Sequence, residues 1–380
     1  MLIEAQAPGK LVIVGEYAVL EGAPGLAVAV DVRAEARIAT LTGNRNSNAG
    51  YPLNGNQLVI PDIGKSYGFR WVPESGPHWE GSSPRAFGLP LTACTEILYA
   101  RGLFPRPSEL PACRIELKSE AFHQTTADGQ RVKLGLGSSA AIVVALTGVL
   151  LRFVGGPPLP RQDLIDICCQ VHRRLQGGAG SGIDIATSLT GGAVAIEFSR
   201  PPGRASGPTP GQVAKLFVRM PQAHPVSWPR QLRLVAAWSG ESASTPAMLR
   251  RLQSFREQAP AAFDGHMGSL NANASQAIAA WTSDDVAGLL TAIAGYESGL
   301  RRLDEAARIG IFSAAHERLR AIAVQHGAVY KPSGAGGGDF GIALTDSRDV
   351  ERALRDAYAA AGIPTLDVEL CALGLHVRTL

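Results

Sequence analysis

The chain has 380 residues, with 36 Lys and Arg against 33 Asp and Glu, so its formal net charge is only +3. A hydrophobic share of 46% and a charged share of 18% indicate a folded chain with a substantial core, long enough for two domains. The near balance of charge argues against a nucleic-acid partner, which would require a basic surface.

Neither a membrane span nor a secretion signal is expected. The longest apolar run, residues 140–151, is interrupted by Thr147 and Gly148 and is shorter than the roughly 18–20 residues that a spanning helix needs. The first residues include Glu4 and no basic side chain, unlike a signal peptide. Five cysteines show no C-x-x-C spacing, which fits a reducing compartment and offers no zinc site. We therefore expect a soluble cytoplasmic enzyme, either a monomer or a homodimer.

Hydrophobic patterning along the chain mixes strands with helices. Strands are predicted at residues 26–40, 113–118, 193–198, 232–238, 341–345 and 366–372. Helices are predicted at residues 86–101, 139–153, 162–176, 246–258, 285–307 and 312–326, the last ended by Gly327. Because strands and helices do not alternate strictly, we expect an α+β fold rather than a doubly wound sheet.

Stretches rich in glycine, proline and polar residues separate these elements. Those at 42–56, 64–85 and 154–161 are predicted to be surface loops. The segment 199–211 has the composition of a linker between domains. We therefore expect two domains, formed by residues 1–222 and 223–380.

Glycine is concentrated in a few places. Four segments, 8–25, 133–141, 177–192 and 331–341, hold 17 of the 43 glycines. Glycine permits sharp turns and a close approach of the backbone to a ligand. Each of the four segments is therefore a candidate ligand-binding segment.

The segment 133–141 is a candidate phosphate site, because two glycines precede a predicted helix. The glycines let backbone N–H groups turn inward, and the helix N-terminus directs its positive end to the same place. The hydroxyls of Ser138 and Ser139 can bind a phosphate oxygen or Mg²⁺. Two alternatives remain open: Ser138 only caps the helix, or Gly135, Gly137 and Ala140 form the dinucleotide-binding pattern G-x-G-x-x-A. The chain contains no Walker A sequence.

The first and last segments each place a lysine beside glycines. Lys10 lies in a Pro-Gly turn, where it is either functional or an ordinary exposed lysine. Glu16 and Tyr17 either contact a ligand or form a satisfied polar pair. Four glycines within residues 334–338 favour a tight, ligand-binding loop with Asp339 at its far rim, and a flexible linker is the alternative.

Asp184, in the third segment, lies between two isoleucines, where a bare carboxylate is costly. It either pairs with a lysine such as Lys10, which would keep the carboxylate ionised, or satisfies backbone donors at a helix N-terminus. The residue types leave both interpretations open.

Together, the four segments resemble the GHMP family of small-molecule kinases, named for galactokinase, homoserine kinase, mevalonate kinase and phosphomevalonate kinase. The specific matches are Gly135-Leu-Gly-Ser-Ser-Ala-Ala and Ser333-Gly-Ala-Gly-Gly-Gly-Asp, which follow each other in the family's order. The resemblance implies an ATP-dependent kinase with the GHMP kinase fold. Its N-terminal domain would resemble ribosomal protein S5 domain 2, its C-terminal domain would be ferredoxin-like, and the active site would lie between them.

Within the family, the details resemble phosphomevalonate kinases more than mevalonate kinases. Tyr17 stands where mevalonate kinases usually carry histidine, and Lys133 stands where they usually carry proline. The helix before the third segment offers His172 and Arg173 where mevalonate kinases tend to carry a Mg²⁺-binding glutamate. The segment 238–245 also resembles phosphomevalonate kinases, although a simple helix cap explains it equally well.

The chemistry of the acceptor gives these differences a reason. A phosphate monoester is already mostly dianionic at pH 7, so phosphorylating it demands charge neutralisation more than deprotonation. An alcohol, with a pKa of about 16, needs a base or a charged partner. Of only six lysines, Lys10, Lys133 and Lys331 lie in the glycine-rich segments, and we expect their ammonium groups beside phosphates.

The implied reaction is transfer of the ATP γ-phosphoryl group to 5-phosphomevalonate. Lys10 would neutralise charge on the reacting groups, and Asp184 would orient Lys10 and the acceptor. Mg²⁺ would bind through Ser139. The alternatives are a kinase for mevalonate or another alcohol, and a non-catalytic relative that binds nucleotide.

The resemblance also implies two sets of binding residues. The ATP phosphates would be held by Lys133, Gly135, Leu136, Gly137, Ser138, Ser139 and Ala140. The acceptor would be contacted by Glu16, Tyr17, His172, Ser181, Gly182, Ser333, Gly334, Ala335, Gly336 and Asp339.

Overall fold

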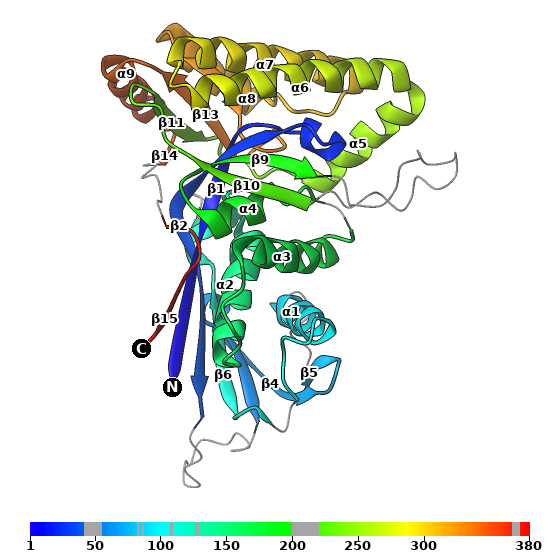
Figure 1. The fold of residues 1–380 in the computed structure, drawn as a ribbon. Coiled ribbons are helices and arrows are strands. Elements are labelled where there is room, and N and C mark those ends of the chain that lie inside the picture. The colour runs from blue at the N-terminus through cyan, green and yellow to red at the C-terminus, as the bar shows by residue number, and fades with distance from the viewer. Residues whose placement is uncertain are drawn as a thin grey trace.

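Two large β-sheets organise the fold, each with its own set of helices (Figure 1). The computed structural model describes residues 1–41, 55–81, 84, 87–106, 109–125, 129–178, 180–199, 220–366 and 373–380. In these residues no helix is both long enough and apolar enough to cross a membrane.

Among the described residues, the larger sheet has nine strands and is built around two long ones. β1 (Leu2–Val14) and β2 (Gly25–Thr40) pair antiparallel over most of their length. β2 also pairs with β9 (Ala193–Ser199) near its start and with β6 (Cys113–Lys118) near its end. The sheet then continues through four shorter strands, β3 (Asn56–Ile60), β4 (Lys65–Val72) and β5 (Gly76–Trp79) beyond β6, and β10 (Met220–Val226) beyond β9.

Four helices lie on one face of this sheet (Figure 1). They are α1 (Leu89–Ala100), α2 (Ser138–Phe153), α3 (Arg161–Leu175) and α4 (Ile183–Thr190). α2 and α4 pack on β1 and β2, while α1 and α3 pack on α2. The apolar run in α2 is buried on nearly all sides, because a helix between a sheet and other helices has no face toward water. A small hairpin of β7 (His123–Thr125) and β8 (Arg131–Lys133) leads into α2.

The smaller sheet has the order β12-β13-β11-β14, with antiparallel pairing throughout. Its elements follow in the order β11 (Arg233–Trp238), a group of helices, β12 (Val329–Pro332), β13 (Phe340–Thr345), α9 (Arg348–Ala360) and β14 (Thr365–Leu366). This order of strands and helices is the βαββαβ arrangement of ferredoxin-like domains. The α+β class and the ferredoxin-like C-terminal part are thereby confirmed.

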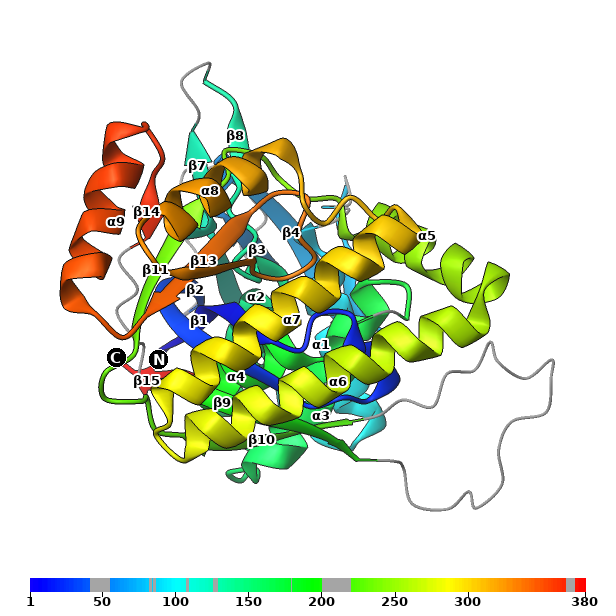
Figure 2. The same cartoon turned by 90° about the horizontal axis from the view of Figure 1, so that it is seen from above.

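The helices between β11 and β12 include a long antiparallel pair, seen side by side in Figure 2. The four helices are α5 (Thr245–Gln258), α6 (Pro260–Thr282), α7 (Val286–Ala307) and α8 (Ala314–Gln325). The long pair is formed by α6 and α7. α7 also contacts β12 and β1. The long pair therefore lies where the two sheets meet.

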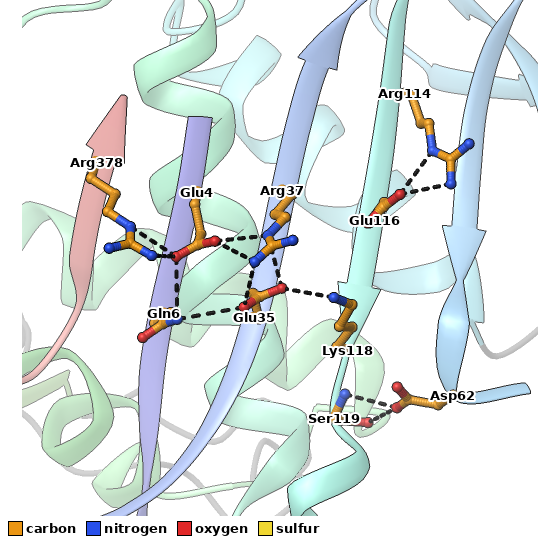
Figure 3. Close-up of polar contacts among 10 residues, drawn as sticks. All are labelled: Glu4, Gln6, Glu35, Arg37, Asp62, Arg114, Glu116, Lys118, Ser119 and Arg378. Atoms are coloured by element: carbon orange, nitrogen blue, oxygen red, sulfur yellow. Dashed lines mark hydrogen bonds and ion pairs between the residues drawn. The ribbon is translucent and has the colours of Figure 1, made fainter. Parts of the chain in front are cut away.

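The last strand, β15 (His376–Thr379), returns to the larger sheet and pairs with β1, so the two termini lie together (Figures 1 and 2). Figure 3 shows the polar contacts that accompany this pairing. Both oxygens of Glu4 are engaged, one 2.6 Å from Nη2 of Arg378 and the other 2.6 Å from Nη2 of Arg37. The carboxylate of Glu4 is almost wholly buried. These two ion pairs join β15, β1 and β2.

The two sheets bear on the proposed domain division. The boundary at 222/223 falls inside β10, which pairs with β9 from Met220 to Val226. The last strand belongs to the larger sheet although it lies at the C-terminus. We therefore propose that the first domain extends through Val226 and also takes residues 376–379.

Most predicted helices and strands are confirmed, with ends that differ by a few residues. The helices α4, α6 and α9 and the strands β3, β7, β8, β10, β12 and β15 were not predicted. The prediction that 64–85 is a loop is wrong because β4 and β5 lie there, and Lys10 lies within β1 rather than in a turn. The predicted linker and the last predicted strand fall largely on residues 200–219 and 367–372, which lie outside the described residues.

Candidate active site

A cavity of about 620 Å³ opens between the two halves of the chain. Its wall comes from the end of β1, the turn before α2, the C-terminal end of α3, the N-terminal start of α4, the start of α5 and the loop after β12. Most of the predicted site residues border it, namely Lys10, Glu16, Tyr17, Lys133, Gly135, Leu136, Gly137, Ser138, Ser139, His172, Ser181, Asp184, Gly334, Ala335 and Asp339. The four glycine-rich segments thus meet at one place.

The turn before α2 has the backbone that its glycines predicted. Gly135 and Gly137 have φ angles of 72° and 83°, in the left-handed region that favours glycine. The N–H of Lys10 donates to the carbonyl of Leu136 at 2.9 Å, which fastens the turn to β1. Because α2 starts at Ser138, the N–H groups of its first turn have no partner within the helix and can bind an anion.

Neither alternative for this segment agrees with the structure. The residue before α2 is Gly137 and no side chain caps the helix, so Ser138 is not a capping residue. Within the described part of the chain, the strand before the turn, β8, pairs only with β7 in a separate two-stranded sheet. A dinucleotide fingerprint would instead follow a central parallel strand.

Lys10 and Asp184 both lie beside Gly137, but they do not pair. A Cβ on Gly137 would lie 3.6 Å from Cε of Lys10 and 3.7 Å from Cβ of Asp184. No ion pair or side-chain hydrogen bond of Lys10 is present in the described part of the chain. Asp184 is instead an acid in the first turn of α4, and it accepts from the N–H of Ile185 at 3.2 Å. The contacts therefore favour the interpretation that Asp184 satisfies a backbone donor at a helix N-terminus over the one that it pairs with Lys10.

His172 lies next to Asp184 on the wall of the cavity. Its Nδ1 is 4.0 Å from Oδ2 of Asp184, and its side chain is buried. The amide nitrogen of Gln176 lies 3.2 Å from Nε2 of His172. Arg173 does not border the cavity, because its guanidinium donates to the carbonyl of Gly180 and lies at Met220. Arg173 therefore adds no charge to the cavity wall, where the cationic side chains of the glycine-rich segments are those of Lys10 and Lys133.

The loop after β12 is attached to the end of β1 by several polar contacts. Ser333 Oγ accepts from the N–H of Val12 at 2.8 Å and donates to its carbonyl at 3.1 Å. The hydroxyl of Tyr17 donates to the carbonyl of Ala335. These contacts exclude the flexible-linker alternative, since the loop is bonded on several sides.

Lys331 is not beside the cavity, contrary to the expectation for the three lysines. Its side chain is wholly buried, and its Nζ lies 2.5 Å from Oε1 of Glu16. Burial lowers the pKa of Lys331, and the neighbouring carboxylate of Glu16 partly restores it. Glu16, predicted to contact the acceptor, borders the cavity but has one oxygen committed to this ion pair.

Asp339 faces the glycine turn from the opposite wall. A Cβ on Gly135 would lie 2.1 Å from Cγ of Asp339, so only glycine fits against this carboxylate. Asp339 has a φ of 60°, which is strained for a residue with a side chain. Burial raises its pKa, although a hydrogen bond from the N–H of Ala243 and the charge of Lys10 oppose the shift.

Four predicted contact residues do not border the cavity. Ala140 is buried within α2 and Gly182 precedes α4 with a φ of 84°. Ser333 is engaged with β1 as described above. Gly336 is packed against Ile311, whose Cγ2 would lie 2.6 Å from an added Cβ. Each of these residues is a sequence neighbour of a residue that borders the cavity.

Sequence patterns missed the apolar part of the wall. Single apolar residues from separate elements carry no signal that they share a cavity. The segment before α5 did carry a sequence signal. The stretch 238–245, which resembles phosphomevalonate kinases, includes the wall residues Ser242, Ala243 and Thr245. The wall residues that were not predicted are Val12, Val19, Leu20, Phe122, Leu175, Gln176, Gly180, Ile183, Ser242, Ala243, Thr245, Pro246 and Leu249.

A glycine turn at a helix N-terminus, an ammonium group beside it and a carboxylate across the cavity define the site of a small-molecule kinase. Comparison with known proteins agrees. The model of the GHMP kinases N terminal domain matches residues 95–192. A phosphomevalonate kinase from Streptomyces sp. (strain CL190) is 30% identical over 95% of each chain. The chain belongs to the GHMP kinase family.

Solved structures share the fold. That of Streptococcus pneumoniae phosphomevalonate kinase in complex with phosphomevalonate and AMPPNP has a TM-score of 0.70 at 20% identity and covers 99% of both chains. That of L. major mevalonate kinase in complex with R-mevalonate has a TM-score of 0.62 at 18% identity, with 98% and 94% covered. The GHMP kinase fold is thereby confirmed, and the chain is a kinase of this family.

Proposed function

We propose that this kinase transfers the γ-phosphoryl group of ATP to the phosphate of 5-phosphomevalonate, giving 5-diphosphomevalonate and ADP. The observation that carries the proposal is the charge around the cavity. The ammonium groups of Lys10 and Lys133 border it, while the charge of Glu16 is already balanced by Lys331. Two substrates that both bring phosphate groups need such neutralisation. The resemblance to the Streptomyces phosphomevalonate kinase agrees with this acceptor.

The donor would bind at the turn before α2. The unpartnered N–H groups at the start of α2 and the hydroxyls of Ser138 and Ser139 would hold the ATP phosphates. Lys10 would place its ammonium between donor and acceptor, since its backbone is bonded to this same turn. Positioning and charge stabilisation of this kind supply most of the catalysis in phosphoryl transfer.

The acceptor would lie between this turn and the ends of α3 and α4. Asp184 and His172, 4.0 Å apart, would orient the acceptor phosphate and the ammonium of Lys10. Because that phosphate is already ionised at pH 7, Asp184 does not need to act as a base. The apolar residues Leu175 and Ile183 on the same wall suit the carbon skeleton of the acceptor.

The donor groups around the cavity fit Mg²⁺, which usually keeps several waters and binds to one or two carboxylates and substrate phosphates. The hydroxyl of Ser139 and the carboxylates of Asp184 and Asp339 border the cavity. No group of three or more His, Cys, Asp or Glu that could hold a metal occurs in the described residues. Mg²⁺ would neutralise charge on the ATP phosphates, with Ser139 as its first protein ligand.

A coupled assay of ADP release by the purified protein tests the proposal. Turnover with 5-phosphomevalonate and little with mevalonate is the expected result. Robust turnover with mevalonate and none with 5-phosphomevalonate would instead identify an alcohol kinase, consistent with the mevalonate kinases among its relatives. The absence of turnover with either acceptor would favour a non-catalytic relative.

A further inference from the structure

The ion pair of Glu16 and Lys331 is buried more deeply than a stabilising role requires. The side chain of Lys331 is wholly inaccessible to water and that of Glu16 is 2% exposed. Besides Glu16, Lys331 donates to the carbonyl of Pro332 at 2.7 Å. Taking two charges out of water costs about as much as their attraction returns, so such a pair is weak evidence for stability. We therefore expect the pair to serve a function other than stability.

Glu16 lies within reach of a second lysine. The N–H of Gly334 donates to Oε1 of Glu16 at 3.2 Å. Nζ of Lys10 is 3.8 Å from the place that a Cβ on Gly334 would occupy. Lys10 is also close enough for its charge to lower the pKa of Lys331. One carboxylate thus has two ammonium groups near it.

In the structure the carboxylate of Glu16 pairs with Lys331, and Lys10 borders the cavity. Nζ of Lys331 is 2.5 Å from Oε1 of Glu16, whereas Lys10 makes no ion pair in the described ranges. Glu16 is also held in place through its backbone, because the hydroxyl of Tyr296 donates to its carbonyl at 2.8 Å. Lys331 therefore occupies a buried anion that could draw Lys10 away from its substrates.

We propose that Lys331 is a positioning residue, which engages Glu16 and thereby keeps the ammonium of Lys10 available to the phosphates in the cavity. The inference rests on the proposed function, since it assumes that Lys10 serves phosphoryl transfer. It assigns Glu16 and Lys331 a part in catalysis without contact between Lys331 and substrate.

The first test compares Lys331→Met with the double variant Glu16→Gln/Lys331→Met. In the single variant Glu16 loses its partner, and Lys10 is an ammonium group that remains close by. Its capture should lower kcat by about 10²-fold, the loss expected when the charge of Lys10 is removed from the transition state. In the double variant the neutral amide does not attract Lys10, so kcat per folded molecule should recover at least ~10-fold. A double variant no faster than the single one would overturn the proposal.

A matched control separates positioning from stability. Arg378→Met removes one cation from Glu4, another almost wholly buried carboxylate, which does not border the cavity. Thermal unfolding of every variant gives the folded fraction to which kcat is referred. Arg378→Met should lower the unfolding temperature and leave kcat per folded molecule unchanged. A comparable loss of kcat in this control would mean that Lys331 acts only through stability.

A second test needs no turnover, so that failure of the inference and failure of the proposed function can be told apart. Acetylation of Lys10 by an amine-reactive ester is followed by peptide mass spectrometry in the full chain without substrates. An opposite charge close by raises the pKa of an amine by about one unit or more, so Lys10 should react roughly tenfold more slowly in Lys331→Met. The Glu16→Gln/Lys331→Met variant should restore the wild-type rate. Equal labelling of Lys10 in wild type and Lys331→Met would refute the inference even if the kinase is active.

Discussion

Replacing Lys10 by Met tests the proposed phosphate chemistry most sharply. Methionine keeps an unbranched apolar stem beside Gly137, where Cγ of Lys10 would lie 3.5 Å from an added Cβ, and removes only the charge. An ammonium about 4 Å from a phosphate oxygen contributes roughly 4 kcal/mol at an effective dielectric constant of about 20. Because Lys10 is only half-buried, water screens part of that interaction. We therefore expect kcat to fall by at least ~10²-fold, equivalent to about 2.7 kcal/mol.

The assay measures kcat and KM from ADP release at saturating ATP. An interaction that strengthens in the transition state lowers kcat and kcat/KM together. Lys118→Met is the matched control, because Lys118 pairs with Glu35 at 3.2 Å and does not border the cavity (Figure 3). A Lys10→Met protein that is folded and keeps the wild-type kcat would refute the role given to Lys10.

Three further predictions concern separate features. Asp184→Asn should lower kcat at least ~10²-fold without unfolding the protein, because it removes the charge that orients the reacting groups. Steady-state kinetics and circular dichroism check this, and an unchanged rate would overturn the assignment. Gly135→Ala should raise the KM for ATP about tenfold or more, since a left-handed residue with a Cβ costs about 1–2 kcal/mol and Asp339 blocks the space. Gly64→Ala is the control for backbone strain, because Gly64 has a φ of 63° and nothing lies within 4 Å of its added Cβ. This control should leave the KM for ATP unchanged. Burial opposes ionisation of Glu4, but hydrogen bonds and charge from its two arginines lower its pKa below the ordinary value of 4.5. The stabilisation from ionised Glu4 is therefore complete above the ordinary pKa and is lost as the pH falls through the lowered pKa. The free energy of unfolding of wild type should therefore approach that of Glu4→Gln in acid, and a constant difference in urea titrations across this range would contradict the assignment.

The glycine-rich segments could be recognised from sequence because their backbone requirement is local. The left-handed φ angles of Gly135, Gly137 and Gly334 are conformations that other residues rarely adopt. A helix following two such glycines creates an anion site without help from distant residues. The glycine turn before α2 and the loop after β12 were therefore predictable in kind and in place.

The pairing of charged side chains was not predictable, because it depends on contacts between distant parts of the chain. The sequence offered Lys10 as a partner for Asp184, yet Asp184 lies beside His172. Lys331, expected near a phosphate, is paired with Glu16, which lies 315 positions earlier. Burial decides these pairings, and local composition does not report it.

Secondary structure was missed where local composition and tertiary packing disagree. α6 contains Gly265, Gly268 and several polar residues, which weaken any helical pattern. It is stabilised by packing along α7. β4 and β5 lie in a stretch rich in glycine and aromatic residues, and their ordering comes from pairing in the larger sheet. Strand pairing of this kind depends on neighbours that the local sequence does not identify.

The central claim is that the acceptor is a phosphate rather than an alcohol. Phosphorus NMR of the product formed from ATP, Mg²⁺ and 5-phosphomevalonate tests it directly, because it distinguishes a P–O–P linkage from a phosphate monoester. We expect two coupled phosphorus signals of a diphosphate ester that appear as ADP accumulates. A 5-phosphomevalonate signal that stays unchanged, while mevalonate under the same conditions gives a new monoester signal, would contradict it.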